Sequence, residues 1–222
     1  MKNRKIITIF ALILLSLFIN INVFAAGKHV YVDDENKDLL AGDTFEGATF
    51  DSSTNTLTLT NYSGGHISFN EFNNETVYVI LNGNNTITNG DGSKDAISAI
   101  NGNEGYTNFE ITGNEGSSLN INTFNYGIFT RTGYLKIKNA NITISNTEYG
   151  IYSQDDEVIL IDSKINISNT SLGVASDYKE ITFNNVVYTG SNLTECGVWA
   201  NSLSANKLTL NFSASDSAAF YI

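Results

Sequence analysis

A short phrase built around glycine recurs at a fixed interval in the C-terminal half of this chain. In each copy glycine is followed by isoleucine or valine, and the four glycines are Gly127, Gly150, Gly173 and Gly197. They lie 23, 23 and 24 residues apart. A fixed period in this range is typical of proteins built from stacked repeats, in which each repeat contacts only its neighbours. The phrase therefore predicts a solenoid rather than a globular domain.

Between the glycines, apolar residues come in pairs whose two members are separated by one residue. This two-residue period is that of a β-strand and not of a helix. The pairs of successive repeats fall into the same columns: Leu135 and Ile137 with Ile142 and Ile144, Val158 and Leu160 with Ile165 and Ile167, Ile181 and Phe183 with Val186 and Tyr188. Asn139, Asp162 and Asn185 lie between the pairs, where we expect a ladder of polar turns. Strands that repeat in column predict a parallel β-helix.

Similar apolar pairs toward both ends extend the pattern to about seven coils of 22 to 30 residues. The longer intervals contain turn-forming insertions at residues 90–94, 113–117 and 201–205, which we expect as loops projecting from the stack. A β-sandwich is the alternative all-β fold, since glycine and asparagine turns also separate sandwich strands. The absence of proline agrees with a ladder that uses nearly every backbone N–H group.

Residues 1–26 have the features of a secretion signal, because basic residues precede an apolar run over residues 6–19 and the segment ends at Ala25 and Ala26. The run is too short for a membrane span to be the better interpretation, and no later segment is apolar enough to span. We therefore expect a secreted protein, extracellular or at the cell surface, and not a transmembrane one.

The two ends of the repeat differ. Residues 27–50 do not follow the period, and we expect them to form an irregular N-terminal cap on a β-helix at residues 51–222. Residues 219–222 resemble the opening of one more repeat. Because an uncovered edge invites pairing, we expect the stack to continue in a larger parent chain or to associate end to end.

The charge of the chain restricts its partners. Without the predicted signal, nine basic and 23 acidic residues give a net charge of −14 at pH 7. This balance argues against nucleic acid, and it disfavours an anionic polymer unless calcium bridges the two surfaces. The only cysteine, Cys196, shares a column with Tyr126 and Tyr149. Regular alternation places that column inward, which predicts a buried, unreactive thiol.

Alignment of the repeats gathers acidic residues on one turn. They are Asp155, Asp156, Glu157 and Asp177. Calcium takes roughly six to eight oxygen ligands, so these four side chains are candidate Ca²⁺ ligands. A solvated acidic turn is the alternative interpretation, since no dedicated calcium-loop signature is present.

A second candidate site is a row of aromatic residues. Phe129, Tyr152 and Trp199 follow the Gly-Ile or Gly-Val step of their repeats, and Ala175 interrupts the row. Alternation points these side chains outward, where aromatic faces can stack on sugar rings. Arg131, the only arginine after the predicted signal, joins them as a candidate sugar contact. The alternative is a structural ladder in which neighbouring rings cover one another.

The sequence assigns no catalytic residue. A glycosidase needs two carboxylates at a defined separation, and a lyase needs a base near a cation. Adjacent residues such as Asp155 and Asp156 tend to point apart, and His66 lies about four coils away from them. A polysaccharide lyase or glycoside hydrolase therefore stands only as an alternative function.

The pattern resembles the right-handed parallel β-helices of the pectin-lyase-like superfamily, and more closely secreted bacterial β-helix proteins described as carbohydrate-binding domains. The resemblance rests on residues 51–59, on residues 77–88 and on the Gly-Ile phrases. It implies association with polysaccharide, sometimes with calcium. Polygalacturonase-like members carry a Gly-His-Gly element, whereas Gly65-His66 is followed here by Ile67. We therefore expect a non-catalytic module that binds polysaccharide, with adhesion to other proteins or a spacer role as the alternative.

Overall fold

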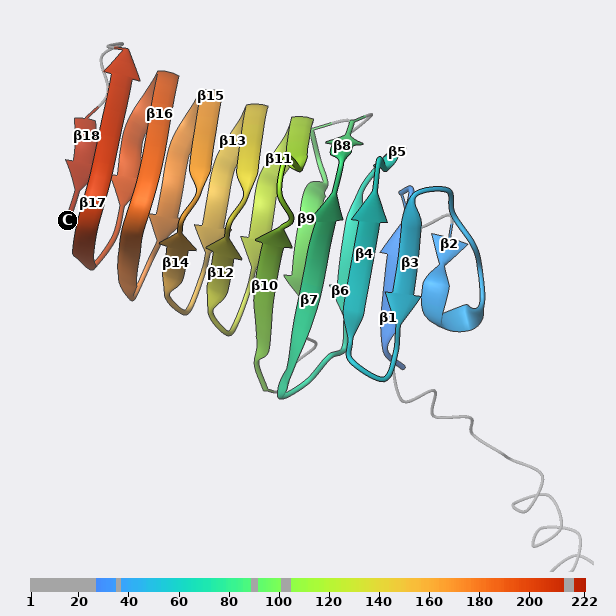
Figure 1. The fold of residues 1–222 in the computed structure, drawn as a ribbon. Helices are drawn as coiled ribbons and strands as arrows, with labels where there is room; N and C mark the ends of the chain where they lie inside the picture. The colour runs from blue at the N-terminus through green and yellow to red at the C-terminus, as the bar shows by residue number, and fades with distance from the viewer. Residues whose placement is uncertain (1–26, 35–36, 89–91, 101–104, 214–217) are drawn as a thin grey trace, which may run out of the picture.

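The computed structural model describes residues 27–34, 37–88, 92–100, 105–213 and 218–222, and the predicted secretion signal lies outside them. The described chain is a parallel β-helix of about seven turns, which confirms the predicted fold class. Figure 1 shows the coils following one another along a rod, with the blue N-terminal strands at one end and the red C-terminal strands at the other.

Each full coil contributes a strand to three parallel sheets. The first sheet contains β4 (Thr56–Thr60), β7 (Glu75–Asn82), β10 (Thr107–Gly113), β12 (Leu135–Lys138), β14 (Val158–Ile161) and the first parts of β16 (Glu180–Trp199) and β17 (Ser202–Ser213). The second contains β5 (Ser63–Gly64), β8 (Asn84–Ile87), the first parts of β11 (Ser118–Thr130), β13 (Asn141–Ser153) and β15 (Lys164–Ser176), the middle of β16 and the end of β17. The third contains β6 (Ile67–Asn70), β9 (Asp95–Ile100), the last parts of β11, β13, β15 and β16, and β18 (Ala218–Tyr221).

The apolar columns seen in the sequence are the core of the coil. Leu135 pairs in register with Val158, which pairs with Ile181, and all three are fully buried. Burying a branched aliphatic side chain stabilises the fold by about 1.5–3 kcal/mol, so the repeat of such columns in every coil supplies the main driving force for folding.

Two strands of the N-terminal segment pair antiparallel with strands of the first coil. The segment contains β1 (His29–Val32), β2 (Lys37–Asp38), a short 3-10 helix η1 (Leu39–Ala41) and β3 (Ala48–Asp51). Strand β1 pairs antiparallel with β6, and β3 pairs antiparallel with β4. These strands therefore occupy edges of the first coil that would otherwise present unpaired backbone groups.

Both short corners of the coil use residues in the left-handed backbone conformation. At the first corner Asn139, Asp162 and Asn185 have φ between 47° and 55°. At the second corner Asn146, Asn169 and Asn192 have φ between 52° and 55°. Asparagine and aspartate tolerate this conformation better than other non-glycine residues. The amide of Asn192 donates to Asn169 over 2.9 Å, and that of Asn169 donates to Asn146 over 3.1 Å. A polar ladder thus holds successive corners together.

Replacement of Asn169 by alanine is expected to lower the free energy of unfolding by about 2 kcal/mol. Alanine loses both amide hydrogen bonds and must also adopt a left-handed conformation that costs about 1–2 kcal/mol. Asn169→Gly loses the same bonds without the backbone penalty, so it is expected to lose only about 1 kcal/mol. Urea unfolding of both variants measures the difference, and equal losses would show that the left-handed conformation carries no cost here.

The column of Tyr126 and Cys196 was predicted to point inward, and this was wrong because regular alternation fails at the repeated glycines. A Cβ atom on Gly127 would lie 2.8 Å from Ile144 in the core, and the next residue, Ile128, is also buried in the core. Two consecutive residues thus face inward, which turns Tyr126 to the outside. The column that contains Tyr126 and Cys196 therefore packs in a second apolar cluster outside the core. Cys196 is nevertheless buried.

The last described coil also differs from the prediction. Residues 202–205 were expected as part of a loop, but they begin strand β17, where Leu203 pairs with Ile181. Leu208 and Leu210 accordingly belong to the second sheet, opposite Val186 and Tyr188. End-to-end association stays a prediction. Within the described part of the chain, no helix has the length and apolar character needed to cross a membrane.

Candidate functional site

Six aromatic side chains line the outer surface of the third sheet, and we call them the aromatic row. They are Tyr126, Phe129, Tyr149, Tyr152, Trp199 and Tyr221. Tyr126 pairs in register with Tyr149, and Phe129 pairs with Tyr152, so equivalent rings lie side by side in these two coils. The row combines the predicted column of Phe129, Tyr152 and Trp199 with the neighbouring column that alternation had placed inside. The glycine after Tyr126 was the signal that could have revealed the second column.

The rings of the first four members stack on one another. Ring centroids lie 4.7 Å apart for Tyr126 and Tyr149 and 5.7 Å apart for Phe129 and Tyr152, with interplanar angles of 14° and 20°. Such offset stacking stabilises the surface of the coil. Tyr126, Phe129 and Tyr149 are only half-buried, so part of each side chain remains open to solvent. The arrangement is therefore both a structural ladder and an exposed apolar strip.

Ala175 does not break the row into two pieces. Leu172, Ala175 and Cys196 are 6%, 1% and 3% exposed, and they pack with the aromatic residues in one cluster. Beyond them, Trp199 stacks on Tyr221 with ring centroids 4.3 Å apart. The third sheet thus carries one continuous apolar strip that runs along the rod.

Acidic groups border this strip. The hydroxyl of Tyr152 donates a 2.6 Å hydrogen bond to Asp177. Burial raises the pKa of Tyr126, and the charges of Asp95 and Glu148 raise it further. The tyrosine rings therefore stay uncharged at neutral pH and present neutral hydroxyl groups beside carboxylates that accept hydrogen bonds.

The predicted calcium ligands are not brought together as a metal site. Asp155 and Asp177 are exposed, and the carboxylate of Asp156 accepts a hydrogen bond from the backbone N–H of Glu157. No group of three or more His, Cys, Asp or Glu side chains suited to a metal ion occurs among the described residues. Arg131 is exposed one coil away, where its carbonyl accepts a backbone hydrogen bond from Asp155.

A small polar pocket of about 210 Å³ lies near the N-terminal end of the aromatic row. His66 is 5% exposed, and its Nδ1–H donates to the backbone carbonyl of Asp95. Asp95 pairs in register with Tyr126. Burial raises the pKa of the Asp95 carboxyl from 3.8 to about 6, although Ser98 lowers it in part. His66 lies on the first coil, whereas Asp155 and Asp156 lie on the turn before β14.

Replacement of Asp95 by asparagine is expected to stabilise the protein at pH 7.5 by about 2 kcal/mol. Because the folded state raises the pKa of this acid, it retains a proton that the unfolded chain releases near pH 4, and wild-type stability falls between about pH 4 and pH 6. The neutral asparagine avoids that loss. Urea unfolding should show a gain at pH 7.5 and none at pH 3.5, and an equal effect at both pH values would exclude this cause.

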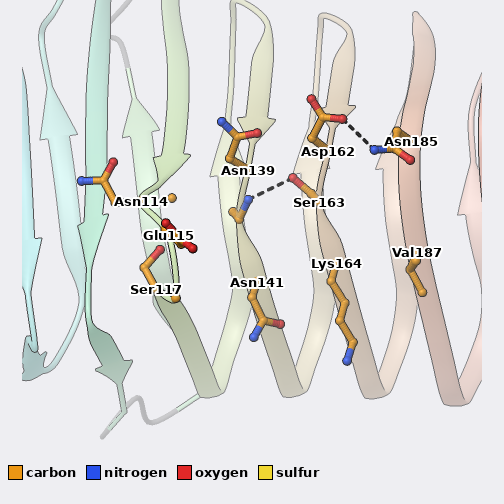
Figure 2. A pocket seen from close by; sticks show the side chains of 13 residues that line it. Asn114, Glu115, Ser117, Asn139, Asn141, Asp162, Ser163, Lys164, Asn185 and Val187 are labelled. Carbon is orange, nitrogen blue, oxygen red and sulfur yellow. Dashed lines mark hydrogen bonds between the residues drawn. The ribbon is translucent and has the colours of Figure 1, made fainter.

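A polar groove lies at the first corner of the coils, away from the aromatic row. It encloses about 710 Å³ and runs from the loop around Glu115 to Val187 three coils later. Figure 2 shows two parallel rows of side chains along it: Asn139, Asp162 and Asn185 in one row, and Asn141, Lys164 and Val187 in the other. The sequence predicted the first row as polar turns but not the groove, because the groove depends on how the preceding loop projects.

Comparison of the chain with known protein families, with curated proteins and with solved structures found no match.

Proposed function

We propose that this chain is a secreted, non-catalytic β-helix module that binds extracellular or cell-wall polysaccharide. The observation that carries the proposal is the aromatic row, whose rings lie on one outer sheet and are joined by Leu172, Ala175 and Cys196 into one apolar strip. Aromatic side chains with one apolar body and one polar edge are suited to surfaces that bind an amphipathic ligand. A pyranose ring is such a ligand, since its C–H groups form an apolar face and its hydroxyls surround it.

The spacing of the row favours a polymer over a single sugar. Successive coils lie about 4.8 Å apart, which is comparable to the length of one pyranose unit in an extended polysaccharide. A chain along the row would meet an aromatic ring on every coil except the one that carries Leu172 and Ala175, with oxygen acceptors such as Asp177 or Glu148 nearby. Many weak and equivalent contacts can then add up to useful affinity.

The charge of the chain indicates which polymers to test first. With a net charge of −11 for the whole sequence, and acidic groups beside the aromatic row, a neutral polysaccharide is favoured over a uronic acid polymer. Calcium remains a candidate cofactor in this proposal because it could bridge carboxylates of the protein and of a uronate. The secreted location is supported by the sequence features of residues 1–26.

The proposal is tested by the retention of the purified protein on neutral and uronic acid polysaccharides, with calcium or with a chelator. Reducing ends and unsaturated products are measured in the same samples, so a hydrolase or lyase would be detected. We expect retention on at least one neutral polymer without product. Absence of retention on every polymer would overturn the proposal and favour adhesion to proteins or a spacer role.

A further inference from the structure

The wall of the corner groove is an insertion into the coil repeat. Two residues, Asn139 and Ala140, join β12 to β13, whereas four residues, 114–117, join β10 to β11 in the preceding coil. The inserted loop is held in place, because the backbone N–H of Ser117 donates to the Asn114 carbonyl over 3.0 Å. The side-chain amide of Asn114 also donates to Asn82 over 2.5 Å. The loop therefore forms a defined end to the groove.

Ser117 lines this groove with an unused polar group. Its side chain is 5% exposed, and its Oγ has no hydrogen-bond partner among the residues that the structure describes. Buried hydroxyl groups in native proteins nearly always have a partner. Ser117 forms part of the groove wall, and because its Oγ atom is covered, the hydroxyl would meet a ligand or a bound water by rotating about the Cα–Cβ bond.

The floor of the groove offers further polar groups. No protein hydrogen bond involves the side chain of Asn139, Asn141 or Glu115 within the described ranges. The amide of Asn185 donates to Asp162 over 2.8 Å, which leaves one Asp162 oxygen available as an acceptor. Figure 2 shows these side chains side by side in consecutive coils. The floor is thus a regular array of amide and carboxylate groups.

The geometry points to a second carbohydrate site at this groove, which takes a neutral, extended oligosaccharide held edge-on by hydrogen bonds. The inserted loop and the array of free amides supply donors and acceptors for sugar hydroxyls, and the Ser117 hydroxyl at the wall has no protein partner among the described residues. The lining contains two carboxylates, Glu115 and Asp162, against one ammonium group, Lys164. An anionic ligand is therefore disfavoured.

The spacing of the array distinguishes a glycan from a peptide. Groups on successive coils repeat at about 4.8 Å, whereas an extended peptide advances about 3.3 Å per residue, so its groups would soon fall out of register. An extended pyranose chain advances by a length comparable to the coil spacing. The groove lies between the first and second sheets, whereas the aromatic row lies on the third, so the two sites can be tested separately.

The test uses neutral hexasaccharides of β-1,4-linked glucose, xylose or mannose, titrated into isotope-labelled protein and followed by NMR. We expect the side-chain amide signals of Asn139 and Asn141 to shift with one of them. The double variant Glu115→Ala, Asn141→Ala should bind that sugar at least tenfold more weakly. Asn211→Ala, an exposed strand asparagine outside the groove, is the matched control and should bind as the wild type does.

Two other outcomes would overturn this inference, and they affect the proposed function differently. If the sugar changes Trp199 fluorescence but leaves the groove signals and the double variant unaffected, the groove site is wrong while the aromatic row stands. If no hexasaccharide binds and the intact protein also fails to retain any polysaccharide, both are wrong. Far-ultraviolet circular dichroism and urea unfolding confirm that each variant is folded.

Discussion

Replacement of Gly150 by valine is expected to lower the free energy of unfolding by more than about 3 kcal/mol, at or beyond the upper end of typical overpacking costs. A Cβ atom at this position would lie 2.5 Å from the carbonyl oxygen of Gly173 and 2.7 Å from Cδ1 of Ile167. The first contact is with the backbone of the next coil and the second is with the core, so neither can move away alone. Valine adds two methyl groups to this obstruction.

The matched control for this change is Gly27→Val. No atom lies within 4 Å of a Cβ built on Gly27, so the same substitution there should leave stability within about 0.5 kcal/mol of the wild type. Urea unfolding of the two variants and the wild type makes the comparison. If Gly150→Val were as stable as Gly27→Val, the repeated glycine would not be explained by the close approach of coils.

Replacement of Trp199 by alanine is expected to weaken polysaccharide binding at least tenfold, which corresponds to about 1.4 kcal/mol. Trp199 is half-buried in the aromatic row and stacks on Tyr221, so its loss removes a large part of the strip near one end. Tyr178→Ala is the matched control, because Tyr178 is 64% exposed and lies outside the row. It should bind as the wild type does.

Affinity electrophoresis, in gels that contain the polysaccharide that retains the protein, measures the affinity of both aromatic variants. Urea unfolding is needed beside it, because removal of a stacked ring also costs stability. A stable Trp199→Ala variant with unchanged affinity would contradict the role of the row. Equal losses for Trp199→Ala and Tyr178→Ala would place the binding surface elsewhere on the coil.

The sequence was sufficient to predict the fold wherever the repeat is regular. The columns of Leu135, Val158 and Ile181 stack as their spacing indicates, because every coil must bury the same face against its neighbours. The polar corner residues Asn139, Asp162 and Asn185 also follow from the pattern, since the turn requires a left-handed residue at each coil. These features are predictable because the period is strict and every coil has the same backbone geometry.

The candidate site was only partly predictable, because it depends on departures from the regular pattern. Two inward residues in succession at Gly127 and Ile128 turn Tyr126 outward, which alternation alone does not indicate. The corner groove arises from the projection of a four-residue loop that the sequence marked only as an insertion. The aligned repeats predicted that these acidic residues share a turn. They do not indicate that Asp177 accepts a hydrogen bond from Tyr152, that Asp156 accepts one from the backbone of Glu157, or that Asp155 is exposed.

The most direct measurement of the central claim is the fluorescence of Trp199 during titration with the polysaccharide that best retains the protein. Trp199 is the only tryptophan in the chain and belongs to the aromatic row, so its emission reports on that surface alone. Binding at the row predicts a saturable change in emission whose midpoint matches the affinity measured by retention. Retention of the protein with an unchanged emission spectrum would contradict the claim.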